Sequence, residues 1–208
     1  MSERNRLNAG CRAIASVSSL RWAFVGVCMA VGASPAWGQC EQKLTALDAT
    51  ANDLFGRSVS VSGDTALVGA YQDDDAGSGS GSAYVYIRSG VVWSLQQKLT
   101  ASDAAAGDFF GFSVSVSGDT ALVGAYGNDD AGDTSGSAYV YVRSGGVWTQ
   151  QQKLTASDAA VQDYFGSSVS VSGDTTVVGA VGNDDAGESS GSRTSTSAPA
   201  ACGPSSRS

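Results

Sequence analysis

The chain of 208 residues contains no histidine. It therefore lacks the side chain that most often serves as a general base near neutral pH and as a zinc ligand. Cysteine is also scarce, because two of the four cysteines fall in the N-terminal segment described below and only Cys40 and Cys202 remain. Two cysteines so far apart do not make the dense disulfide framework of small secreted domains. We predict that the protein is not an enzyme and has no disulfide scaffold.

Basic residues are few relative to acidic ones. The chain has 12 Lys and Arg against 20 Asp and Glu, which gives a formal net charge of −8. A surface with this balance repels phosphate and attracts divalent cations. We therefore expect no nucleic-acid partner.

No apolar run is long enough for a membrane span. The apolar stretch from Trp22 to Ala33 is 12 residues long, whereas a spanning helix needs about 20. Four arginines precede this stretch, and the small residues Ala36 and Gly38 follow it. This order is typical of a secretory signal, so we predict a signal peptide at 1–38 and a secreted or extracytoplasmic chain with no membrane span after cleavage. A retained anchor is the alternative.

What fills the remainder of the chain is one unit repeated three times. The sequence Gln-Lys-Leu-Thr begins at residues 42, 97 and 152, a spacing of 55 residues. Segment 58–71 recurs unchanged as segment 113–126. A repeat of this length is a supersecondary unit that buries its apolar face by stacking on its neighbours. We predict an array over 39–192, with units starting at 42, 97 and 152 and the third unit incomplete.

Each unit has the pattern of four short strands. In the second unit, segment 113–117 alternates serine and valine, as a half-buried strand does. The continuous apolar run 120–126 predicts a buried inner strand, the polar segment 127–136 an exposed loop, and segments 138–143 and 147–155 two further strands. Four antiparallel strands per unit predict an all-β fold of propeller blades. A solenoid of parallel coils is the alternative.

The repeats contain a pair of short motifs. Phe-Gly stands at Phe55-Gly56, Phe110-Gly111 and Phe165-Gly166, and Gly-Ala follows at Gly69-Ala70, Gly124-Ala125 and Gly179-Ala180. These blocks resemble the FG-GAP repeat, best known from the propeller head of integrin α chains. The resemblance implies a β-propeller in an extracytoplasmic protein, often one that recognises another macromolecule. The third letter of the Gly-Ala-Pro motif departs from the pattern, since Tyr71, Tyr126 and Val181 replace proline.

Calcium binding is the second departure. The integrin-type repeat carries a calcium loop between its first two strands, but this chain has only Ser-Gly-Asp there, which is too short to supply six to eight oxygen ligands. Acidic residues gather in the longer loop instead. The candidate calcium ligands in this loop are Asp73, Asp75, Asn128, Asp130, Asn183 and Asp185. The alternative to calcium binding is a solvated loop in which Asp and Asn bond to nearby backbone groups.

Repeated aspartates and aromatics also invite a functional interpretation. Asp53, Asp108 and Asp163 recur once per unit, as do Asp64, Asp119 and Asp174, and such repetition favours a structural role such as closing a turn. Aromatic residues at matching positions indicate packing between units, with ligand binding as the alternative. These aromatics are Trp93, Trp148, Tyr84, Tyr86, Tyr139 and Tyr141.

The C-terminal segment 193–208 does not continue the repeat. A single-nucleotide deletion after the codon of Ser192 would convert the expected continuation into these residues and a stop codon. We interpret 193–208 as a frameshifted, disordered tail, and expect the truncated array to self-associate through its uncovered apolar faces.

The function expected from these features is binding without catalysis. We expect a surface-exposed adhesion or binding protein with a protein or carbohydrate ligand and no cofactor other than calcium. A purely structural exported array without a discrete ligand is the alternative.

Overall fold

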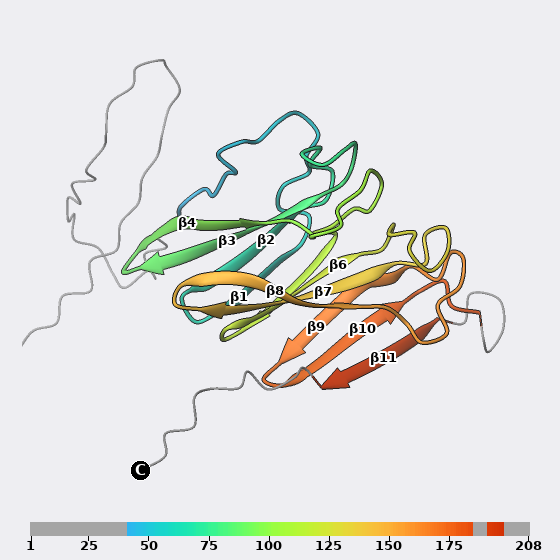
Figure 1. Cartoon of the computed structure of the whole chain (residues 1–208). Helices are drawn as coiled ribbons and strands as arrows, with labels where there is room; N and C mark the ends of the chain where they lie inside the picture. Colours follow the sequence, from blue (N-terminus) through green and yellow to red (C-terminus); the bar gives the residue numbers. More distant parts are fainter. Residues whose placement is uncertain (1–40, 185–190, 198–208) are drawn as a thin grey trace, which may run out of the picture. The chain divides into compact units, whose positions relative to one another are not determined.

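The structure, a computed structural model, describes residues 41–184 and 191–197. The predicted signal peptide at 1–38 lies outside these residues. Residues 45–208 cluster as one compact unit, and every regular element in its described part is a β-strand (Figure 1). The described residues form no helix that could cross a membrane. The all-β prediction is therefore confirmed.

Each repeat folds into its own antiparallel sheet with the strands in chain order. The first sheet contains β1 (Val59–Ser62), β2 (Thr65–Ala70), β3 (Ser82–Ser89) and β4 (Val92–Leu99). The second contains β5 (Ser113–Ser117), β6 (Thr120–Ala125), β7 (Ser137–Ser144) and β8 (Val147–Leu154). The third contains β9 (Phe165–Ser172), β10 (Thr175–Ala180) and β11 (Ser192–Ser197).

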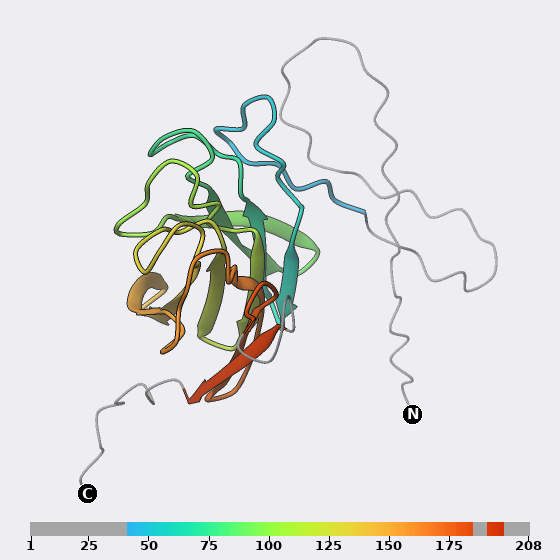
Figure 2. The same ribbon diagram turned by 90° about the vertical axis from the view of Figure 1, so that its right-hand side faces the viewer.

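Two kinds of connection alternate along the chain. The hairpins turn within two residues, and the turn between β1 and β2 begins at Gly63 with a φ of 57°, a conformation that glycine adopts without steric cost. The β2–β3 and β4–β5 connections are longer, and they gather at the opposite end of the sheets (Figure 1). Figure 2 looks onto this loop end and shows the loops of successive units following one another. We call it the loop end.

The four-strand pattern predicted from the sequence is confirmed, and the solenoid alternative is wrong. β6 is buried and lies between β5 and β7. Its continuous apolar run has a direct explanation, because both of its faces are covered. Ala121 and Val123 pack toward the first unit, whereas Leu122 packs toward the third.

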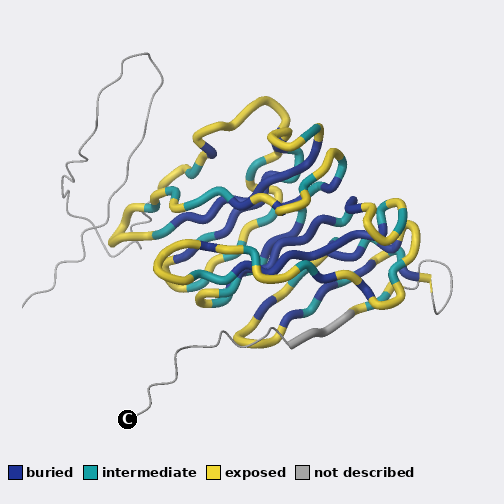
Figure 3. Tube along the Cα trace, viewed as in Figure 1, coloured by how far each residue is buried: buried dark blue, intermediate teal, exposed yellow. Residues whose placement is uncertain are grey.

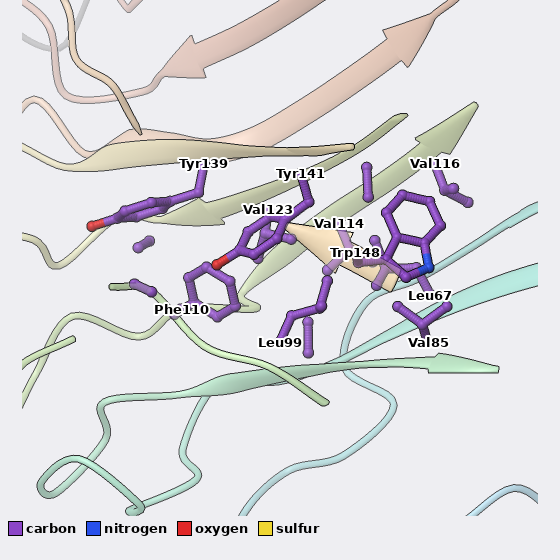
Figure 4. Close-up of a cluster of buried hydrophobic side chains, with 14 residues drawn as sticks. Leu67, Val85, Leu99, Phe110, Val114, Val116, Val123, Tyr139, Tyr141 and Trp148 are labelled. Atoms are coloured by element: carbon purple, nitrogen blue, oxygen red, sulfur yellow. The ribbon is translucent and has the colours of Figure 1, made fainter. Parts of the chain in front are cut away.

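The apolar core lies between the sheets (Figure 3). One cluster joins Leu67, Val85 and Leu99 of the first unit to Phe110 and Trp148 of the second (Figure 4). A second cluster joins Leu122, Val140 and Leu154 to Phe165 and Val171 of the third unit. Each unit therefore buries its apolar surface against its neighbour, as a stacked repeat must. The three sheets form an open, propeller-like array.

The C-terminal segment differs from the predicted disordered tail over part of its length. Residues 192–197 form β11, which pairs with β10 in the register that β3 adopts on β2: Ala180 faces Ser192 as Ala70 faces Ser82. Backbone pairing depends little on side-chain identity, because the hydrogen bonds join main-chain groups. Residues 198–208 lie outside the described part of the chain.

Candidate functional site

The Phe-Gly and Gly-Ala motifs form the junction between units. A Cβ atom on Gly69 would lie 1.9 Å from the carbonyl oxygen of Gly111 in the next unit, and one on Gly124 would lie 2.0 Å from that of Gly166. Phe110 is buried between the units, and its N–H donates to the carbonyl of Ser80 at 3.1 Å. The motifs thus fix how closely two sheets approach.

The alternating serines of the first strand make a second inter-unit contact. The N–H groups of Val114 and Val116 donate to the hydroxyl oxygens of Ser58 and Ser60 at 3.0 and 3.1 Å. The N–H of Val171 donates in the same way to Ser115 at 3.0 Å. These bonds satisfy edge-strand donors that the strand's own sheet leaves free.

The predicted calcium ligands Asp73 and Asp75 lie together at the loop end, with Asp48. One carboxylate oxygen from each falls within 4.8 Å of the others. The ammonium of Lys98 lies among them, 2.7 Å from Asp48, 3.0 Å from Asp73 and 2.5 Å from Asp75. The hydroxyl of Tyr84 completes the group, 3.0 Å from Asp73. A lysine side chain therefore supplies positive charge at the centre of this cluster.

The charges of this cluster shift one another's pKa. The hydrogen bond from Lys98 holds the pKa of Asp48 below its usual value. Burial alone would lower the pKa of Lys98, but its hydrogen bonds to Asp48 and Asp75 raise it above the ordinary range. The two groups are thus charged throughout the neutral range.

The second unit carries a weaker version of the cluster. Lys153 pairs with Asp103 at 2.6 Å and with Asp130, but Asn128 stands where the first unit has Asp73. Asn128 bonds to Ser137 and Asp108 instead. The hydroxyl of Tyr139 is the only buried side-chain polar group in the described residues without a hydrogen-bond partner.

Position in the loop decides how far each predicted ligand is exposed. The first residue of each acidic triplet is buried, with Asp73, Asn128 and Asn183 each 3% exposed. The interpretation as a solvated loop is wrong for these buried residues. Asp73 and Asn128 accept hydrogen bonds from the strand-end serines Ser82 and Ser137, at 3.1 and 2.8 Å. The predicted Asx-type bonds are confirmed, since Asp75 N–H donates to Asp73 Oδ1 at 3.3 Å. Asp185 lies outside the described residues.

The other repeated aspartates have structural roles, as predicted. Asp108 accepts from the N–H of Ala105 at 2.8 Å, and Asp163 accepts from that of Ala160 at 2.7 Å. Asp119 accepts from Arg143 Nε at 2.7 Å and so ties the first hairpin to the third strand. The structure does not bring these aspartates together as an acid–base pair.

The aromatics singled out in the sequence are chiefly packing residues. Tyr139, Tyr141 and Trp148 are buried in the core between the first two units (Figure 4). Phe110 contacts both tyrosines edge-on, with ring centroids 5.5 and 6.0 Å apart. Trp148 Nε1 donates to Gln96 at 3.0 Å. The prediction of packing between units is confirmed for these three residues.

A second set of aromatics was missed in the sequence and is partly exposed at the loop end. Tyr71 contacts Phe109 and Phe112, at centroid distances of 5.9 and 5.2 Å. Both phenylalanines contact Tyr126, at 5.2 and 4.5 Å, and Tyr126 lies 6.0 Å from Tyr164. We call these five residues the aromatic row. It runs without interruption from the first unit to the third.

Comparison with known proteins agrees with this geometry. The model of the FG-GAP repeat matches residues 37–86, 93–141 and 148–193. The chain belongs to the FG-GAP repeat family. No curated protein matches it. FG-GAP repeats are typical of extracellular domains and are generally non-enzymatic.

Two of the five residues of the aromatic row stand where this chain departs from the FG-GAP motif. Tyr71 and Tyr126 occupy the position of the proline, directly after the Gly-Ala pair. The residue before each of the three Phe-Gly pairs has a positive φ, 53° at Leu54 and 56° at both Phe109 and Tyr164. This conformation is uncommon for bulky residues and marks a turn of the backbone. The missing proline was therefore the sequence signal for this surface.

A hollow lies at the third-unit end of the row. Its volume is about 440 Å³, and it is lined by Phe112, Tyr126, Tyr164, Ser167 and Val181. Burial raises the pKa of Tyr126 above its usual value, so this hydroxyl stays protonated at neutral pH. None of the lining residues carries a formal charge.

Proposed function

We propose that this FG-GAP repeat chain is a secreted or surface-exposed binding protein without catalytic activity, and that it binds a protein or a carbohydrate through its loop end. The observation that carries the proposal is the aromatic row. Large rings bury much apolar area when a partner covers them. Partly exposed rings at the loop end are therefore suited to contact with another molecule.

The charge and the position of the row support this proposal. Residues 39–208 carry 19 acidic and 8 basic side chains, a net charge of −11, which disfavours nucleic acid and anionic polymers as ligands. The row is built from the longer connections, and loops held by a rigid sheet scaffold are common sites of binding. A cell-surface adhesion role fits these features.

The alternative is a structural array in which the row merely packs against other repeats. The two functions predict different behaviour of the row in the isolated chain. In a binding protein, replacing exposed ring residues reduces ligand retention and leaves assembly unchanged. In a structural array, the same replacement changes assembly and there is no ligand to lose.

Calcium is a further proposal. Asp73 and Asp75 would have to share their oxygens between an ion and the ammonium of Lys98, which favours weak binding. Calorimetric titration of the chain with calcium tests it. Heat of binding at millimolar calcium is expected if these carboxylates are ligands, and a flat titration contradicts the proposal.

The proposed function is tested by retention of the secreted chain on immobilised probes. The probes are neutral polysaccharides (cellulose, chitin, xylan and starch) and a random peptide array. We expect retention on at least one probe, and loss of that retention when Tyr71 and Tyr126 are both replaced by valine, the residue that the third unit carries at this position. No retention on any probe contradicts a binding function.

A further inference from the structure

We propose that the hollow lined by Phe112, Tyr126, Tyr164, Ser167 and Val181 is a binding site for a neutral saccharide ring. The inference rests on the proposed function and names the site and the ligand class within it. A volume of about 440 Å³ is within the usual range of about 300–1,000 Å³ for small-molecule sites.

Two changes between the repeats open the hollow, because Ser167 and Val181 of the third unit stand where the second unit has Phe112 and Tyr126. Phe112 of the second unit packs against Tyr71 at 5.2 Å and Tyr126 at 4.5 Å, and so fills the junction with the first unit. The matching residue of the third unit, 55 positions later, is Ser167. Serine cannot fill the space that phenylalanine fills, so the rings of Tyr126 and Tyr164 border an open hollow at the next junction. The chain thus contains its own closed version of the site.

The walls of the hollow are fixed by the backbone. A Cβ atom on Gly182 would lie 2.8 Å from the Tyr164 ring and 1.9 Å from the carbonyl oxygen of Gln162, so the ring rests directly against the glycine backbone. The Tyr164 N–H donates to the carbonyl of Thr134 at 3.1 Å. The Ser167 hydroxyl donates to the carbonyl of Gly179 at 3.2 Å. A wall held in this way loses little conformational entropy on binding.

The chemistry of the lining selects a neutral, amphipathic ligand. A sugar ring has an apolar face of C–H groups and a rim of hydroxyls. The rings of Tyr126 and Tyr164 provide apolar surface for the first, and their hydroxyls are able to hydrogen-bond to the second. The five lining residues carry no formal charge. Arg57, a cation that is not among them, lies over the Phe112 ring, 5.0 Å from its centroid. The net charge of −11 over 39–208 repels acidic polymers.

Titration of the full secreted chain with neutral disaccharides (cellobiose, diacetylchitobiose, xylobiose and maltose) tests the inference by calorimetry. Two variants change the hollow: the first fills it and the second removes a ring from its wall. Both introduce a residue that another unit of the chain already has at the matching position. Ser167→Phe introduces the residue of the second unit, Phe112. Tyr164→Leu introduces the residue of the first unit, Leu54. Val147→Ala, at an exposed valine that is 55% accessible and belongs to β8, is the control.

We expect at least one disaccharide to bind, and both hollow variants to weaken it by about tenfold or more, which corresponds to about 1.4 kcal/mol. Val147→Ala should change affinity less than twofold. Equal melting temperatures for all four proteins show that the hollow variants remain folded.

Other outcomes separate the site from the function. Saccharide binding that survives Ser167→Phe overturns the hollow but leaves a carbohydrate-binding function. Binding to peptides with no saccharide binding overturns the ligand class and leaves a binding function. No binding to any probe overturns both.

Discussion

At the scale of single residues, the close approach of the first two units requires a glycine at position 69. Gly69 has an ordinary φ, so an alanine there meets no backbone strain of its own, but its Cβ would overlap the carbonyl oxygen of Gly111 at 1.9 Å. We expect Gly69→Ala to lower the free energy of unfolding by about 3 kcal/mol, because the sheets must move apart. Urea denaturation measures this loss.

Gly179→Ala is the matched control. It is the same position in the third unit, where the nearest atom to a new Cβ is the Ser168 hydroxyl at 2.4 Å. A side-chain oxygen can rotate away, whereas a backbone carbonyl cannot. The cost should therefore be well below that of Gly69→Ala, and equal losses would contradict the junction.

Lys98 is the second residue whose removal is informative. Lys98→Met leaves Asp48, Asp73 and Asp75 without a counter-charge. We expect a loss of about 1–2 kcal/mol at pH 7, because only Asp73 is buried and solvent screens the other two carboxylates. The cost should be smaller for Lys153→Met, since Asn128 replaces one carboxylate in the second unit. Chemical denaturation at pH 7 compares the two variants.

The pH dependence of stability should also change sign in Lys98→Met. In the wild type the pKa of Asp48 is held low by Lys98. Its contribution to stability is thus present above the unfolded pKa near 4 and is lost as pH falls through the folded value. In the variant, mutual repulsion raises the carboxylate pKa values, so stability should rise as pH falls from 7 to 5. A fall over that range would contradict the charge cluster.

At the scale of the strand, the serines of β1 hold β5. Ser60→Ala removes the acceptor for the Val116 N–H and should cost about 1 kcal/mol. Ser170 is the matching residue of the third unit and is exposed, so Ser170→Ala should change stability by less than about 0.5 kcal/mol. Thermal unfolding of the two variants gives the comparison, and similar values would argue against the inter-unit bond.

The strands are also the part of the fold that the sequence predicted best. The predicted segments 113–117, 120–126, 138–143 and 147–155 match β5 to β8 within a residue or two, because alternation and glycine turns are local signals. The partners of a strand are not local. The period-two pattern placed valine and serine on opposite faces, but did not show that the serines accept bonds from the next unit.

Candidate ligands and aromatics were predicted less completely, for the same reason. Asp73 and Asp75 were identified, but their neighbour Lys98 lies on β4, 23 residues beyond Asp75. The aromatic row combines residues from two kinds of loop in three units, so no single segment displays it. Only the replacement of the motif proline by Tyr71 and Tyr126 pointed to this surface.

At the scale of the whole molecule, the first unit exposes a face that is covered in the others. Val59 and Val61 are 67% and 66% exposed, whereas Val114 and Val116 are each 6% exposed because the first unit packs on them. We therefore propose that the chain self-associates through this face. Sedimentation velocity should detect oligomers, and the double variant Val59→Ser, Val61→Ser should reduce them. A monomer at all concentrations would contradict this proposal.

Stacking of successive units is the claim on which the fold, the junction and the loop-end surface all depend. Residue-resolved amide hydrogen exchange tests it directly. The N–H groups of Val114 and Val116 bond to serines of the preceding unit. They should exchange at least about a hundredfold more slowly than those of Val59 and Val61, against which no unit packs in the described part of the chain. Equal exchange rates at the four valines would contradict the stacked array.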